Sequence, residues 1–267
     1  MSGQANVEPR VYRAGLALRE GSVEAVVFDL PGCQCVASDR EEALNLLPVV
    51  IAEHLAWLDQ HGDVTRDAFP FQLDVVEEVE VDALTDIADG EFCFDDDRRP
   101  TTREEVETAL RHMSYARADL LAAVRHLPDL VLDWVPPTGA VEVDRWAPAV
   151  RSVRGILDHI AGADGYYVRN VGSAPWAGPA GPQPGGLFEM RERVVQRLRT
   201  LSEADLAAEY RKRQPWQAAG FEHWTARKAL RRIISHERFH TREIEQRLAW
   251  LLIGAPKLAR VATGSRA

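Results

Sequence analysis

The stretch TARKALRRIISHERFHTREIEQRLAWLL, residues 225–252, carries the strongest structural signal in this chain. It predicts one long amphipathic helix, because its apolar and polar residues follow the helical repeat of 3.6 residues. Within it, His236 and His240 are four residues apart and therefore lie one above the other on one face. Both imidazole rings can reach one metal ion from that face.

Three further helices are expected before this one. They cover about 102–127 and 148–171 and begin near Leu187, with a long Pro/Gly-rich loop at 172–186. Four amphipathic helices are enough for a four-helix bundle. We therefore predict an all-α bundle over residues 100–254 and a flexible tail at 255–267.

The first part of the chain has the pattern of a small α+β domain. Short apolar stretches between turn residues predict strands at 11–18, 25–28, 33–37 and 71–76. One main helix is expected to begin after Ser38 or Asp39, either of which can cap it, and to end at His61-Gly62. The charged segment 95–100 ends in a proline, so we place the boundary there and predict the first domain at 1–99.

The charges of the chain are divided unevenly between these two parts. Residues 1–99 hold 7 arginines and no lysine against 22 acidic residues, whereas residues 100–267 hold 25 basic and 19 acidic residues. The net charge is therefore −15 for the first part and +6 for the second, and −9 for the whole chain. A strongly acidic surface repels phosphate groups, so a nucleic-acid partner is not expected.

The composition also argues against membrane and secreted classes of protein. No apolar run reaches the roughly 18 residues typical of a membrane-spanning helix. The first ten residues, MSGQANVEPR, lack the apolar centre of a signal peptide, and three cysteines do not make a disulfide framework. We therefore expect a cytoplasmic protein.

A third histidine completes a candidate metal site. His159 is an isolated polar residue on the apolar face of the predicted helix 148–171. Facing helices of a bundle lie about 8–10 Å apart, so His159 can meet His236 and His240 in the core. Three neutral imidazoles with an open coordination position suit Zn, Ni or Fe(II) and can activate a water or a thiol. The alternative is a core histidine bonded to a backbone carbonyl, with the other two facing water.

The segment 236–240 also matches the H-E-x-x-H pattern of zinc peptidases, in which Glu237 would be the general base. A peptidase needs a third ligand at a distance from this helix. No histidine follows His240, and Glu243 and Glu245 lie too close on the same helix to serve. The peptidase interpretation is therefore the weaker one.

The helical part resembles the DinB-like superfamily over about 102–253. The residues that carry the resemblance are Arg154-Gly155-Ile156-Leu157-Asp158-His159-Ile160, Tyr166-Tyr167, the run from Trp224 to Arg232 and the run from His236 to Ile244. The family includes metal-dependent thiol transferases and mycothiol-dependent isomerases. The resemblance implies that His159, His236 and His240 hold a divalent metal. It further implies a thiol-dependent transferase or hydrolase with a low-molecular-weight thiol as cosubstrate.

Residues 10–82 resemble a second family, the HicB-like antitoxin domain, a partial ribonuclease-H-like fold. The matching residues are Phe28-Asp29-Leu30-Pro31-Gly32-Cys33, Ser38-Asp39-Arg40-Glu41-Glu42-Ala43, Trp57-Leu58 and Gly62. Such antitoxins usually add a DNA-binding domain, and here the helical part takes its place. This leaves a non-enzymatic sensing or dimerisation module of antitoxin-like origin as an alternative function.

Several further residues are candidates for a role around the metal. Residues that could support the ligands through hydrogen bonds are Glu243, Asp158 and Glu237. Residues that could line a substrate pocket are Tyr166, Tyr167 and Arg232. The basic cluster Arg227, Lys228, Arg231 and Arg232 is expected to be solvated or to dock on the acidic part. We expect a homodimer that binds a small molecule or a thiol.

Overall fold

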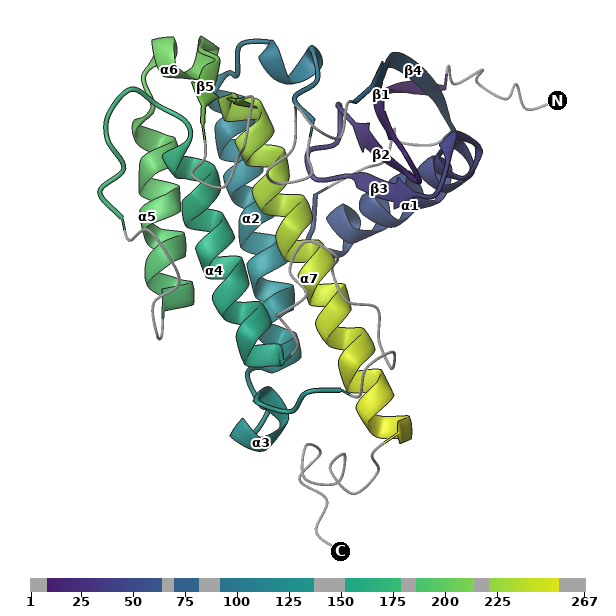
Figure 1. Cartoon of the computed structure of the whole chain (residues 1–267), viewed down its shortest axis with the longest axis vertical. Coiled ribbons are helices and arrows are strands. Elements are labelled where there is room, and N and C mark those ends of the chain that lie inside the picture. Colours follow the sequence, from purple (N-terminus) through teal and green to yellow (C-terminus); the bar gives the residue numbers. More distant parts are fainter. Residues whose placement is uncertain are drawn as a thin grey trace, which may run out of the picture.

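The computed structural model describes residues 9–63, 70–81, 92–136, 152–178, 186–213 and 221–254. A strand-rich N-terminal region is followed by a helical C-terminal part, as the sequence predicts (Figure 1). Among the described residues, no helix is both long and apolar enough to span a membrane.

The N-terminal region is a four-stranded sheet with one long helix. Its elements are β1 (Arg10–Arg19), β2 (Ser22–Val27), β3 (Gln34–Ala37), α1 (Arg40–Gln60) and β4 (Phe71–Glu80). The strands are ordered β3-β2-β1-β4; β1 pairs antiparallel with β2 and parallel with β4. The predicted strands and helix are all present, although β4 continues four residues beyond the predicted 71–76.

Local chemistry explains these elements. Alternate residues of β1, among them Tyr12, Ala14 and Leu16, are fully buried in the core that the sheet shares with α1. Asp39 caps α1, because its side chain accepts a hydrogen bond from the backbone N–H of Glu42. The β4 side chains alternate between half-buried and exposed, as expected for a strand at the edge of a sheet.

The helical part contains four long helices that lie side by side (Figure 1). They are α2 (Arg103–Val124), α4 (Val153–Arg169), α5 (Gly186–Thr200) and α7 (Ala226–Gly254). Each corresponds to a predicted helix. Residues 148–151, where the second helix was expected to begin, and the predicted tail 255–267 lie outside the described residues.

Short elements that the sequence pattern did not predict precede or connect the long helices. They are the 3-10 turn η1 (Asp96–Arg98), α3 (Asp129–Leu132), α6 (Glu203–Ala207) and the hairpin of β5 (Tyr210–Lys212) and β6 (Glu222–Trp224). Elements of three to five residues are too short for a hydrophobic period to show.

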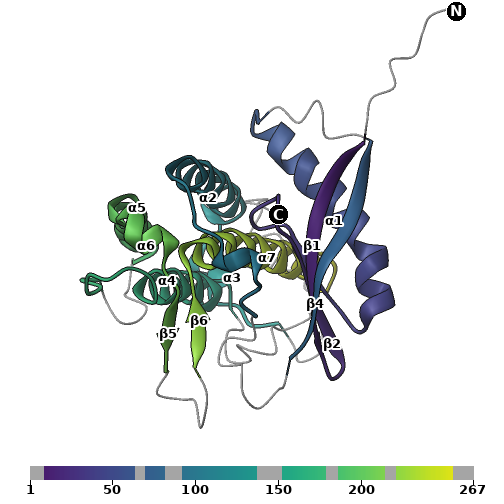
Figure 2. The same ribbon diagram turned by 90° about the horizontal axis from the view of Figure 1, so that it is seen from above.

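Helix α7 is the element that joins the two parts of the molecule. Viewed from above, it lies between the other long helices and the sheet (Figure 2). One apolar core contains residues from both parts, for example Leu47 and Ile51 of α1 and Ala229 and Ile233 of α7. The hydroxyl of Thr225 accepts from the N–H of Lys228 at the start of α7 and donates to the carbonyl of Asp97.

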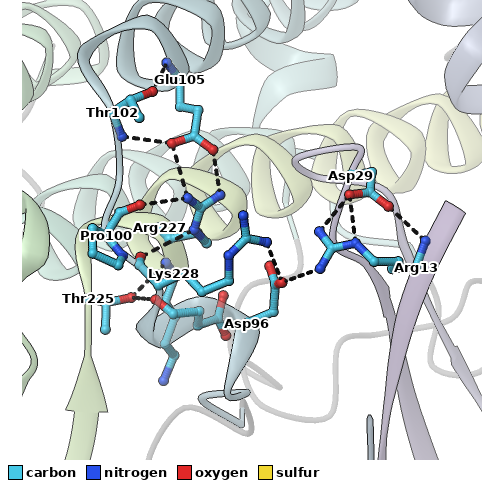
Figure 3. A network of polar contacts seen from close by, with 11 residues as sticks. Arg13, Asp29, Asp96, Pro100, Thr102, Glu105, Thr225, Arg227 and Lys228 are labelled. Carbon is cyan, nitrogen blue, oxygen red and sulfur yellow. Dashed lines mark hydrogen bonds and ion pairs between the residues drawn. The ribbon is translucent and has the colours of Figure 1, made fainter. Parts of the chain in front are cut away.

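The basic cluster at the start of α7 is docked and not solvated. Arg227 pairs with Glu105 and donates to the carbonyl of Pro100 (Figure 3). Arg231 is buried and donates from Nε and Nη2 to the two carboxylate oxygens of Asp97, each at 2.8 Å. The alternative of docking against the acidic part therefore holds for Arg231.

Candidate metal centre

Three histidines from two helices converge in the core of the helical part. His159 lies on α4, and His236 and His240 lie one turn apart on α7. The Nε2 atom of His236 is 3.1 Å from the Nε2 atoms of both His159 and His240. One ligand atom from each ring lies within 4.8 Å of the other two. His240 is fully buried, whereas His159 is half-buried.

A carboxylate fixes the orientation of the His240 ring. The Nδ1–H group of His240 donates to Glu243 Oε2 at 2.7 Å, and Arg247 donates to the other oxygen at 2.5 Å. Burial tends to raise the pKa of Glu243, but these two hydrogen bonds outweigh it and hold the pKa below its usual value. With the proton on Nδ1, the lone pair of His240 Nε2 points towards the other two rings.

His236 is in the form that binds metals. Burial, together with His240, His159 and Arg232 nearby, holds its pKa well below the usual range, so the ring is neutral at pH 7. Tyr167 packs edge-on against it, with ring centroids 5.6 Å apart. The Nδ1 atom of His236 is buried and has no hydrogen-bond partner among the described residues.

The separations of His236 Nε2 from His159 Nε2 and from His240 Nε2 fit a shared metal ion. Ligand nitrogens about 2.0–2.1 Å from Zn²⁺ stand about 2.9–3.4 Å from one another at tetrahedral or square angles. The observed separations of 3.1 Å lie in this range. Neutral nitrogen lone pairs at such a distance repel each other unless a proton or a cation lies between them. Three imidazoles are also a donor set that zinc, nickel and iron(II) accept.

The predicted supporting residues Glu243, Glu237 and Asp158 differ in burial and in the groups that they contact. Glu243 contacts a ligand directly, as described above. Glu237 is fully buried, and its carboxylate accepts hydrogen bonds from Arg117 and Arg191 of the neighbouring helices. Asp158 is exposed on α4, next to His159 in the sequence.

Two of the three pocket candidates lie beside the histidines. Arg232, one turn before His236, donates to the hydroxyl of Tyr167 at 2.9 Å. Tyr166 instead points to the β5–β6 hairpin, where its hydroxyl donates to the carboxylate of Glu222. Arg247 was not predicted from the sequence, and its spacing of seven from His240 and four from Glu243 is the signal that could have found it.

Residues 112–244 match the family model of the DinB superfamily. Residues 112–244 within the helical part are therefore similar to the DinB superfamily. The matched range contains His159, His236 and His240 and runs from α2 into α7. Neither the comparison with curated proteins nor the comparison with solved structures gives a match. The DinB match does not extend to residues 10–82, where the HicB-like resemblance stays a prediction.

Proposed function

We propose that the DinB-like part is a four-helix bundle that holds one divalent metal ion through His159, His236 and His240. We further propose that the protein is a metal-dependent thiol transferase or hydrolase. The observation that carries this proposal is the convergence of three Nε2 atoms, one of them oriented by the buried Glu243. Zinc, nickel and iron(II) are the proposed metals.

Three protein ligands leave a coordination position open, and a metal there lowers the pKa of a bound thiol or water. The chain's own residues would prepare this position. Glu243 holds the His240 ring in its ligating tautomer. Arg232 and Tyr167 stand beside His236, where a guanidinium can take an anionic group of the substrate.

The thiol would come from a cosubstrate, because none of the three cysteines is suited to supply a thiolate. Burial raises the pKa of Cys33 to about 12 and those of Cys35 and Cys93 to about 11. Such groups are protonated at neutral pH. A low-molecular-weight thiol that reaches the half-buried side of the site at His159 is the partner that fits.

The peptidase alternative loses support from the position of Glu237. A general base must face the water that attacks the peptide bond. The carboxylate of Glu237 is instead fully buried and bonded to two guanidinium groups that come from α2 and α5. This leaves neither oxygen directed at the histidines.

Metal analysis of the purified protein tests the proposal. We expect about one equivalent of a divalent metal in the wild type, and its loss in His159→Ala and His240→Ala. His126→Ala, in the exposed turn after α2, is the control and should retain the metal. Full retention in both ligand variants would exclude this site.

A second measurement separates an enzyme from a sensing module. If the protein is an enzyme, a cellular thiol should perturb the absorption of the cobalt-loaded site, and thiol conjugation should be lost in His240→Ala. Metal binding without any thiol effect would favour the non-enzymatic module. A homodimer is proposed for either case, and analytical ultracentrifugation tests it.

A further inference from the structure

Each of the four long helices contributes one charged side chain to a cluster in the core. The members are Arg117 of α2, Asp164 of α4, Arg191 of α5 and Glu237 of α7, and we call them the charge cluster. The side chains of Asp164 and Glu237 are 1% and 0% exposed, and those of the two arginines about a tenth. Two negative and two positive groups balance each other, so the cluster carries no formal net charge.

The contacts within the charge cluster link all four helices. Arg117 donates to one carboxylate oxygen of Glu237 and Arg191 to the other. Both guanidiniums also reach Asp164 Oδ2, at 3.3 Å from Arg117 and 2.8 Å from Arg191. Each arginine therefore bridges the carboxylate on α4 and the carboxylate on α7.

The two arginines also fix the helices that carry them. Arg117 of α2 donates to the carbonyl of Leu187 on α5 at 2.8 Å, and Arg191 of α5 donates to the carbonyl of Met113 on α2 at 3.2 Å. Helices α2 and α5 thus hold each other through reciprocal bonds. Together they present two fixed guanidiniums to α4 and α7.

The charge cluster and the histidines share the same two helices. Glu237 directly follows His236, and successive helical residues point about 100° apart around the axis. When Glu237 is held towards α2 and α5, the rotation of α7 about its axis is set, and with it the direction of His236. A side-chain end about 5–6 Å from a helix axis moves by about 2 Å when the helix rotates by about 20°. Such a shift is enough to separate nitrogens that are 3.1 Å apart.

We propose that the charge cluster positions the three histidines. It would do so by fixing the rotation of α4 and α7 relative to α2 and α5, which are joined by reciprocal hydrogen bonds. Only the expected effect on metal affinity rests on the proposed function. The effect on the contacts between the histidine rings does not depend on a metal. Apolar contacts alone specify rotation poorly, since neighbouring packings differ little in buried area. Charge-assisted arginine–carboxylate hydrogen bonds are directional, and here each arginine is shared between the carboxylates of Asp164 and Glu237, which admits few geometries.

Glu237→Gln is the variant that tests this role most directly. It preserves the shape of the side chain and removes the charge that both arginines bind. Because a buried pair that loses one partner is strongly destabilised, Arg191→Lys provides a milder second variant. Lysine keeps the positive charge but lacks the planar fork that spans Asp164 and Glu237.

Asp97→Asn is the matched control. Asp97 forms an equally buried pair with Arg231, which also lies on α7 but faces the N-terminal region. The control therefore destabilises the same helix from its other side. A purely structural role of the charge cluster predicts that the variants and the control behave alike.

Two readouts on folded, full-length protein decide the question. In metal-free protein, we expect the nuclear Overhauser contacts between the rings of His159 and His236 to weaken or disappear in Glu237→Gln and Arg191→Lys and to persist in Asp97→Asn. In cobalt titrations, we expect affinity to fall about 10-fold or more and the absorption bands to shift in the two variants only.

The outcomes separate this inference from the proposed function. Ring contacts and cobalt spectra that are unchanged in folded Arg191→Lys would overturn the inference. If wild type binds no cobalt while the ring contacts still depend on the charge cluster, the proposed function fails and the positioning role stands.

Discussion

The hydrogen bond between His240 and Glu243 is the single contact that decides which ring nitrogen of His240 faces the other histidines. Glu243→Gln replaces a charged acceptor by a neutral one and weakens the bond to Nδ1–H. We expect metal affinity to fall by about 10-fold, because partners of metal-bound histidines typically contribute about 10- to 100-fold. Competition with a chromogenic chelator measures this change.

The neighbouring Glu245 supplies the control for that experiment. It lies two residues further along α7 and is exposed. Glu245→Gln removes the same charge from the same helix without touching a histidine, so its affinity should stay within about twofold of wild type. Equal losses in both variants would point to a general effect of charge on α7.

Buried histidines make the stability of the metal-free protein sensitive to acid. Burial, with the cationic neighbour Arg238, holds the pKa of His54 well below its usual value. Burial also lowers the pKa of His112, although Asp63 works against it. Below about pH 6.5 these histidines therefore bind protons in the unfolded chain but not in the folded chain. Their contribution to the free energy of unfolding is present above that pH and is lost as the pH falls.

We expect His54, whose pKa is held well below this range, to remove about 1.4 kcal/mol of unfolding free energy between about pH 7.5 and about pH 5.5, and His112 to remove less. Denaturation of metal-free protein at the two pH values measures the loss. His54→Gln should reduce the difference between the two pH values, whatever it does to the absolute stability. His126→Gln, in the exposed turn after α2, should leave the difference as in wild type.

At the scale of elements, the loop between β2 and β3 docks the sheet onto α7. Gly32 in this loop has a φ of +86°, and a Cβ atom there would lie 2.4 Å from Cγ2 of Ile234 on α7. We expect Gly32→Ala to lower the free energy of unfolding by more than the about 1–2 kcal/mol that left-handed strain alone costs. Thermal or chemical denaturation measures the loss.

A substitution at Gly21 is the control that separates backbone strain from the contact between the β2–β3 loop and α7. It has a φ of +70° in the β1–β2 turn, and a Cβ atom there would meet nothing within 4 Å. Gly21→Ala therefore costs the backbone strain without the clash. If the two variants lose the same stability, the loop does not depend on its contact with α7.

The long elements could be predicted from the sequence because each has a local signal. Thr102 and Glu105 form a capping box at the start of α2, and Ser152 caps α4. The additional residues of β4, up to Glu80, lack such a signal. That strand is half-buried at the sheet edge, so its charged residues Glu77 and Glu78 conceal the apolar alternation.

The candidate site could be predicted in part for the same reason. The spacing of His236 and His240 is local, and His159 stands out as a polar residue on an apolar face. The charge cluster could not be found in this way. Arg117 and Glu237 are 120 residues apart and meet only after the helices pack. On an isolated helix either would be expected to face water.

At the scale of the whole molecule, acidic and basic side chains pair with each other where the N-terminal region meets the helical part. The acidic segment around η1 faces the basic start of α7. Asp96 accepts a hydrogen bond from Arg13 (Figure 3) and another from Arg99. Burial tends to raise the pKa of Asp96, but the two arginines outweigh it and keep the pKa low. Because Arg13 lies on β1, this network ties the sheet to the segment that leads into α2.

The shared core and the buried Arg231–Asp97 pair predict that both parts unfold together. We expect a single transition, seen alike by helical circular dichroism and by tryptophan fluorescence, because Trp57 lies on α1 and Trp224 at the start of the α7 region.

Asp97→Asn leaves Arg231 buried with a weakened partner and should lower the free energy of unfolding by about 3–5 kcal/mol. Asp95→Asn, whose side chain is 87% exposed, should change stability by less than about 0.5 kcal/mol. Two separate transitions in wild type would show that the parts fold independently, and equal stabilities of the two variants would show that the buried pair does not join them.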